Sequence, residues 1–124
     1  MKTISLINLK GGIGKTITAI NLAHILAVKY NAKVLLVDND KQGNISKYFN
    51  LHSYERDSIA ELLTDKSISA GDVLRHTSYG IDVVPANMNL LRANKEILID
   101  CTRPQQSRLK RALDSVCFNY DYCI

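Results

Sequence analysis

The stretch that decides the fold reads Lys10-Gly11-Gly12-Ile13-Gly14-Lys15-Thr16. It lies between a short β-type run at residues 4–8 and a segment at residues 16–27 whose apolar side chains recur at helical spacing. Glycines allow backbone N–H groups to converge on a phosphate, and the N-terminus of the following helix adds partial positive charge at the same place. The stretch therefore predicts a phosphate-binding loop in which Lys15 reaches the β- and γ-phosphates and the Thr16 hydroxyl ligates Mg²⁺. The strict GxxxxGKS/T pattern is not met, because Leu9 occupies its first glycine position.

The segments that follow extend this loop into a sheet. Residues 33–38 read Lys-Val-Leu-Leu-Val-Asp, an apolar run without alternation that is typical of a parallel strand buried on both faces. Strand, glycine loop, helix and strand form one βαβ unit. Short helices are expected after the polar residues 38–44, and one of them carries a capping box of Ser58 and Glu61. We also expect strands at residues 80–85 and 120–124 and helices around residues 90–99 and 105–116. The pattern predicts an α/β fold with a mostly parallel sheet flanked by helices, which stops inside a later strand.

Length and composition narrow the class of protein. The 124 residues allow one domain, and a hydrophobic content of 46% is too high for a disordered chain. No apolar run approaches the roughly 18 residues of a membrane span, and the first residues do not resemble a signal peptide, so we expect a cytoplasmic protein. Three cysteines without a CxxC pair argue against a disulfide framework or a zinc site. The net charge of +4 comes from scattered residues and does not decide the function.

Lys10 makes the glycine loop specific. A second lysine at the front of GGxGKT is the deviant Walker A motif, and residues 10–16 resemble that motif in the ParA/MinD family of P-loop ATPases. The resemblance continues through Asn21-Leu22-Ala23, residues 34–38, residues 40–44 and residues 83–87. It implies a P-loop NTPase fold, ATP and Mg²⁺ as cofactors, and ATP hydrolysis to ADP and phosphate. It also implies that residues 1–124 are the N-terminal part of a single ATPase domain whose C-terminal part is absent, so that this part alone is inactive.

The same resemblance assigns roles to residues. Lys10 would reach the partner's nucleotide across an ATP-dependent homodimer, much as an arginine finger does. Asp40 would position the attacking water, and Asp38 would support the Mg²⁺ shell together with Thr16, although turn and cap chemistry is the alternative for both carboxylates. The catalytic residues are then Lys10, Lys15 and Asp40. The nucleotide-binding residues are Lys10, Gly11, Gly12, Ile13, Gly14, Lys15, Thr16 and Ile17.

Two residues depart from the family pattern. Ile17 stands where the family usually has a second threonine, so one hydroxyl that commonly contacts the α-phosphate is missing. Lys41 replaces the usual proline of DxDPQGN, which leaves the turn less rigid and adds a positive charge near the site. Nucleotide binding therefore follows more directly from the sequence than turnover does.

The Walker B carboxylate is expected outside residues 1–124. Ile97-Leu98-Ile99-Asp100-Cys101 imitates a strand that ends in Asp, but it follows the strand at 80–85 too closely for a parallel crossover. We therefore expect Asp100 to be a helix residue. Tyr120-Asp121-Tyr122 matches the start of the family's Walker B strand, which places the true Asp a few residues beyond Ile124 and leaves Walker B and the adenine-recognition loops outside this chain.

Other candidate residues carry weaker signals. His24 is expected on a helix surface or at the edge of the core, and His52 and His76 have no partner at metal-ligand spacing. A late helix carries a basic face, which we expect to be solvated rather than a DNA contact. Its members are Arg103, Arg108, Lys110 and Arg111.

The family resemblance implies a partition ATPase, an interpretation that Gln42-Gly43-Asn44 favours. ATP would drive dimerisation, the dimer would bind DNA without sequence preference through the absent C-terminal half, and a ParB-type centromere-binding partner would trigger hydrolysis. Such a protein would be associated with the bacterial nucleoid and not with a membrane. A MinD-like regulator, with a membrane-binding amphipathic helix outside this chain, is the alternative. A relative of the nitrogenase iron protein and a non-catalytic nucleotide-binding module are further alternatives.

Overall fold

The computed structural model describes residues 1–102, 104 and 107–124. Within these residues the strands form one five-stranded sheet in the order β1-β5-β2-β4-β3. The strands are β1 (Lys2–Thr3), β2 (Val34–Val37), β3 (Arg75–His76), β4 (Ile81–Val84) and β5 (Tyr122–Cys123). All neighbouring pairs are parallel except β3 and β4, which are antiparallel. The expected α/β class with a mostly parallel sheet is confirmed.

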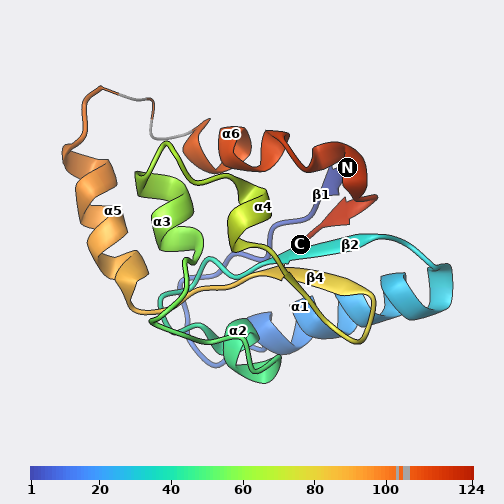
Figure 1. Ribbon diagram of the computed structural model, residues 1–124. Coiled ribbons are helices and arrows are strands. Elements are labelled where there is room, and N and C mark those ends of the chain that lie inside the picture. The colour runs from blue at the N-terminus through green and yellow to red at the C-terminus, as the bar shows by residue number, and fades with distance from the viewer. Residues whose placement is uncertain (103, 105–106) are drawn as a thin grey trace.

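Helices cover both faces of this sheet. The helical elements are α1 (Lys15–His24), η1 (Ile25–Lys29), α2 (Asn44–Tyr48), α3 (Ile59–Thr64), α4 (Ala70–Val73), α5 (Asn89–Ile99), α6 (Arg108–Asp114) and η3 (Cys117–Asn119). Figure 1 shows α1 and α2 on one side of the sheet and α3, α4, α5 and α6 on the other. η1 continues α1 as one π-helical stretch. In the part of the chain that the structure describes, no helix has the length and apolar character needed to cross a membrane.

Alternate residues of the central strands supply two separate cores. Val34 and Leu36 of β2 pack in one core with Ala23 and the other buried residues of α1. Leu35, between them, packs in the other core with α3 and with Leu113 of α6. All three β2 residues are completely buried, which explains why the strand is apolar without alternation. Parallel strands covered on both faces have no position that tolerates a solvated side chain.

The first strand is shorter than expected and begins earlier. The sequence predicts a strand at residues 4–8, whereas β1 covers only Lys2 and Thr3. The register explains the difference, because Thr3 is opposite Cys123 and the last backbone bond runs from the amide of Ile4 to the carbonyl of Cys123 (2.8 Å). Within residues 1–124, β5 therefore offers residues 5–8 no further partner. The Ile7 side chain is accordingly exposed.

Residues 97–99 are helical and not a strand, whereas Asp100, expected as a helix residue, lies one position beyond the helix with an extended backbone. Residues 97–99 belong to the last turn of α5. The Asp100 carboxylate pairs with the guanidinium of Arg108 in α6. Asp100 is therefore part of a contact between two helices and is not a strand carboxylate at the edge of the sheet.

One residue expected on the solvated basic face of the last helix does not lie there. Arg108 is buried, because α6 packs against α3 and the guanidinium donates both to Asp100 and to the carbonyl of Leu63 (3.3 Å). Lys110 and Arg111 are exposed, and Lys110 lies near Asp114 of the same helix. Arg103, and residues 105–106 at the expected start of this helix, fall outside the described residues.

Three short elements, α3, α4 and β3, lie between α2 and β4 in the sequence. The Ser58–Glu61 capping box is present, with the Ser58 hydroxyl donating to Glu61 (2.7 Å) and accepting from the amide of Ala60 (3.2 Å). α4 lies in the region where short helices are expected, whereas β3 is not expected from the sequence. β3 pairs antiparallel with β4 just after the chain reverses at Gly80, and its two residues form a strand only through this pairing.

Candidate nucleotide-binding site

The glycine loop has the backbone geometry that its sequence predicts. Gly12 and Gly14 adopt positive φ angles of 73° and 86°, a region that other residues rarely enter. α1 begins immediately afterwards at Lys15, and no side chain caps its N-terminus. The first turn of α1 also contains no acidic residue. The loop therefore ends at a helix N-terminus whose amides and partial positive charge favour an anion.

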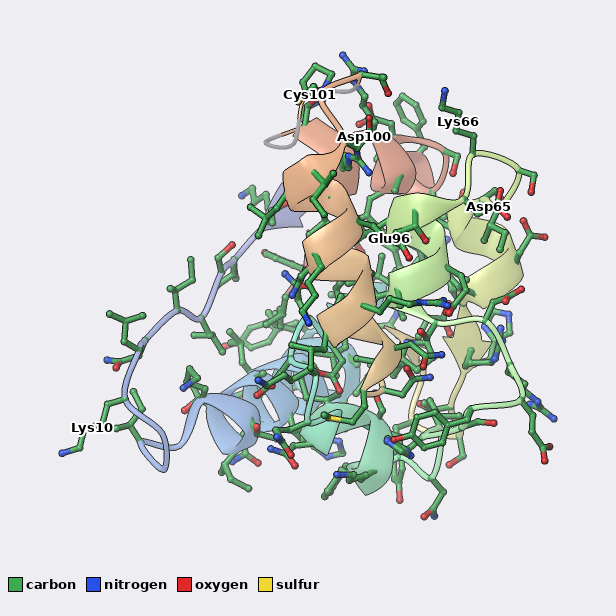
Figure 2. All side chains as sticks on the ribbon, turned by 90° about the vertical axis from the view of Figure 1, so that its left-hand side faces the viewer. Lys10, Asp65, Lys66, Glu96, Asp100 and Cys101 are labelled. Atoms are coloured by element: carbon green, nitrogen blue, oxygen red, sulfur yellow. The ribbon has the colours of Figure 1, made fainter. Side chains whose placement is uncertain are left out.

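The two lysines of the loop take opposite directions. Lys15 folds back along the loop, and its Nζ donates to the backbone carbonyl of Lys10 (3.1 Å). The Lys10 amide is held by the Asn8 side chain (2.8 Å), while its own side chain extends away from the body of the protein (Figure 2). One ammonium group thus lies within the loop, and the other faces outward.

The remaining loop residues lie in or beside the first turn of α1. Thr16 is half-buried and is the second residue of the helix, and Ile17 follows it with 61% of its surface exposed. Gly11 and Ile13 are exposed. The eight expected nucleotide-binding residues, Lys10 to Ile17, thus form the glycine loop and the first turn of α1.

Asp38 lies at the carboxyl end of β2 and is tied to α2. It is 2% exposed, and its Oδ2 accepts hydrogen bonds from the Ser46 amide (2.9 Å) and the Ser46 hydroxyl (2.7 Å). Its Oδ1 accepts from the amide of Asp40 (3.3 Å). Burial raises the pKa of the Asp38 carboxyl above its ordinary value, because desolvation penalises the charged form more than these hydrogen bonds favour it.

Asp40 is exposed and opens a tight turn. Its carboxylate accepts from the amide of Gln42 (3.0 Å), and its carbonyl accepts from the amide of Gly43 (2.8 Å). Lys41 occupies the second position of this turn and is exposed. The Asp40 carboxylate is therefore accessible to solvent, and it can contact a ligand at the carboxyl end of the sheet.

Gly43 is where this turn touches the end of β4. It has a φ angle of 60°, and a Cβ at this position would lie 2.6 Å from the Ala86 carbonyl oxygen and 2.9 Å from the His52 ring. Backbone conformation and close packing both exclude a side chain. The sequence motif contains this glycine, but only the packing shows why it is needed.

Replacing Gly43 with alanine is expected to destabilise the protein by about 2–4 kcal/mol, because the strain of a positive φ adds to the overlap with Ala86. Urea unfolding followed by circular dichroism measures the loss. Gly71→Ala is the matched control, since Gly71 lies in α4 and a methyl group added there would have no atom closer than 3.7 Å. Equal stability of the two variants would contradict the steric explanation.

The histidines and cysteines form no metal centre. Among the described residues, no group of three His, Cys, Asp or Glu side chains is arranged to hold a metal ion. His24 is exposed on α1 beside the Tyr79 ring, as the sequence suggested, and His76 contacts Asp82 (2.7 Å). Cys123 is buried in β5, and burial raises the pKa of its thiol to about 11. These positions give no support to an iron–sulfur site.

Ser46 is the residue of this region that sequence reasoning missed. It is completely buried, and its hydroxyl joins Asp38 to the amide of Ala86 (2.8 Å), which follows β4. A serine eight residues after a candidate carboxylate carries no recognisable spacing signal. Its role depends on where the chain returns forty residues later.

Comparison with known proteins identifies the family. The sequence model of a family described as an AAA domain matches residues 1–124. The sporulation initiation inhibitor protein Soj of Bacillus subtilis is 37% identical over 124 residues, which cover 99% of this chain and 48% of Soj. The chain belongs to the ParA/MinD family of P-loop ATPases. The chromosome partitioning protein ParA of Caulobacter vibrioides is 32% identical, over 98% of this chain and 45% of that protein. The ParA/MinD-type chain thus spans less than half the length of these two relatives.

Solved structures show the same fold for this ParA/MinD-family chain. A cobyrinic acid a,c-diamide synthase from Mycobacterium smegmatis with bound ATP analogue and magnesium has a TM-score of 0.89 at 29% identity, over 99% of this chain and 49% of that one. A plasmid partition protein from Borrelia burgdorferi has a TM-score of 0.83 at 28% identity, over 98% of this chain and 54% of that one. The fold expected from the glycine loop, that of a P-loop NTPase, is confirmed.

Proposed function

We propose that residues 1–124 are the N-terminal part of a ParA-type ATPase that binds ATP with Mg²⁺ and hydrolyses it. The observation that carries the proposal is the glycine loop, in which Lys15 lies within the turn and the uncapped N-terminus of α1 closes it. Backbone amides, the helix terminus and one ammonium group together favour a polyphosphate. The similar synthase structures with a bound ATP analogue or ADP, each with magnesium, support the same cofactors.

Each predicted site residue has a role in this proposal. The amides of residues 10–17 hold the phosphates, Lys15 neutralises the β- and γ-phosphates, and the Thr16 hydroxyl ligates Mg²⁺. Asp40 positions the attacking water from its exposed turn, and Asp38 supports the metal shell from the neighbouring strand end. Mg²⁺, when bound, neutralises charge that develops on the phosphates during transfer.

The Walker B carboxylate belongs, in this proposal, to residues beyond Ile124. β5 lies between β1 and β2, and the amide of Val37 bonds to the carbonyl of Ile124 (2.8 Å). A strand continuing in the same direction would run toward the carboxyl edge of the sheet, between residues 5–8 and Asp38. That direction supports a carboxylate arriving beside the phosphate loop.

The outward direction of Lys10 supports action on a second subunit. Its side chain extends away from its own loop, whereas Lys15 occupies that loop (Figure 2). An ATP-dependent homodimer would bring each Lys10 to the partner's nucleotide. The dimer would bind DNA without sequence preference through the C-terminal half, and a ParB-type partner would stimulate hydrolysis. The relatives named for chromosome and plasmid partitioning support this assignment.

DNA binding that depends on ATP tests the partition assignment. The full-length protein is expected to bind random-sequence duplex DNA only with ATP and Mg²⁺, and the affinity should fall steeply with salt because phosphate contacts release counterions. Fluorescence anisotropy at several salt concentrations measures this, with Lys15→Ala as the variant that should lose it. ATP binding without DNA binding would contradict the partition role and favour a MinD-like protein, for which binding to anionic lipid vesicles is the next measurement.

A further inference from the structure

The buried hydroxyl of Ser46 joins three segments that meet at the candidate site. It donates to Asp38 Oδ2 (2.7 Å), at the end of β2, and accepts from the amide of Ala86 (2.8 Å), at the end of β4. The amide of Ser46 donates to the same Asp38 oxygen (2.9 Å). Because the Ala86 amide can only donate, the hydroxyl proton must point to Asp38. The direction of this hydrogen-bond chain is therefore defined.

The same network holds both ends of the turn that carries Asp40. At its start, Asp38 Oδ1 accepts the amide of Asp40 (3.3 Å). At its end, Gly43 packs directly against the carbonyl of Ala86, immediately before α2, which carries the fully buried Ser46. Asp40 itself is exposed, and among the described residues the hydrogen bond of its carboxylate is the local one from the Gln42 amide. Its position relative to the phosphate loop thus depends on how firmly Asp38 and Gly43 are held.

We propose that Ser46 is a positioning residue for ATP hydrolysis, which fixes Asp38 and through it the turn of Asp40. This inference rests on the proposed ATPase function. Within the described part of the chain, the partners of the Ser46 hydroxyl are Asp38 and Ala86 and not the glycine loop, so we expect its loss to affect hydrolysis more than nucleotide binding. Its removal leaves the Ala86 amide without its buried partner and leaves Asp38 Oδ2 with one of its two hydrogen bonds from Ser46, so the turn is held less firmly. Catalysis is sensitive to such losses, since small misplacements of a positioned group slow the chemical step.

The chain contains a closely matched control for the purely structural effect of losing a buried serine. Ser58 is 2% exposed, and its hydroxyl also donates to a carboxylate, Glu61 (2.7 Å), and accepts from a backbone amide, that of Ala60 (3.2 Å). Its amide donates to the same carboxylate oxygen (2.9 Å). Ser58 caps α3, whose apolar residues pack in the other core. Ser58→Ala therefore removes the same kind of hydrogen bonds at a residue whose own bonds go to Glu61 and Ala60 and not to Asp38 or Asp40.

Steady-state ATPase assays and ATP binding, both on the full-length protein, test the proposal. Ser46→Ala is expected to lower kcat by at least about tenfold while the Kd for ATP changes by less than about threefold, because the phosphate loop is intact. Ser46→Thr, which keeps the hydroxyl, should restore kcat to within about threefold of the wild type. Ser58→Ala should keep the wild-type kcat although it unfolds at a lower urea concentration.

The outcomes separate the two proposals. If the wild-type protein hydrolyses ATP, two outcomes would overturn the role of Ser46 alone. One is an unchanged kcat in Ser46→Ala, and the other is a loss of kcat in Ser58→Ala as large as that in Ser46→Ala. A wild-type protein that does not hydrolyse ATP would overturn the proposed function as well. If Ser46→Ala does not fold, Ser46→Cys retains the volume with a weaker donor, and an unreduced kcat in that variant would overturn the positioning role.

Discussion

Lys15→Ala is expected to abolish ATP binding, with a Kd raised by at least about a hundredfold. The ammonium group lies within the glycine loop, where it donates to the carbonyl of Lys10 (3.1 Å) and stands beside the place that a polyphosphate would take. Charge-assisted hydrogen bonds to a phosphate contribute about 1.5–3 kcal/mol each, and every 1.4 kcal/mol is about tenfold in affinity. Titration of a fluorescent ATP analogue in the presence of Mg²⁺ measures the change.

The fold should not depend on Lys15. Its one described hydrogen bond is exposed, so the free energy of unfolding is expected to change by less than about 0.5 kcal/mol. Lys29→Ala, at the far end of the same helical segment, is the control for loss of a positive charge and should bind ATP normally. Unchanged affinity in Lys15→Ala would show that the glycine loop is not a phosphate site.

Lys10→Ala is expected to separate ATP binding from dimerisation. Because the Lys10 side chain extends away from its own loop, its loss should change the Kd for ATP by less than about threefold (Figure 2). The same change should remove the ATP-dependent dimer, since an ammonium group that neutralises the partner's phosphates would be missing at both sites of a symmetric interface. Sedimentation velocity of the full-length protein, with ATP and Mg²⁺, measures the dimer.

A surface lysine on another element controls for the general loss of charge. Lys47→Ala, on the exposed side of α2, should dimerise like the wild type. If Lys10→Ala still forms the ATP-dependent dimer, Lys10 does not act on the partner's nucleotide. Weakened ATP binding by the Lys10→Ala monomer would instead assign this lysine to its own nucleotide.

Much of the fold was predictable because the relevant signals are local. The apolar run at 34–37 and the helical spacing after Gly14 both led to the elements that the structure contains. The capping box of Ser58 and Glu61 is likewise complete within four residues. Each of these elements follows from neighbours in the sequence, so periodicity and cap chemistry were sufficient.

Three features of the structure differ from what neighbouring residues in the sequence predict. The segment at residues 4–8 was expected as a strand, whereas within residues 1–124 only Lys2 and Thr3 pair with the two residues of β5. Arg108 was expected in solvent with the other basic residues of its helix, yet α6 turns it toward Asp100 and the Leu63 carbonyl. β3 could not be anticipated, because two residues form a strand only through pairing with β4.

The sequence by itself determined the glycine loop and the polarity of its site. Gly12 and Gly14 permit the backbone that converges amides on an anion, and Lys15 follows at the start of α1, all within one turn of chain. Only the tertiary structure decided that Gly43 must meet Ala86 without a side chain and that Ser46 must connect Asp38 to the end of β4. The physical reason is distance along the chain. Backbone preferences act between neighbours, whereas a buried hydroxyl finds its partners forty residues away only when both strands are packed in one sheet.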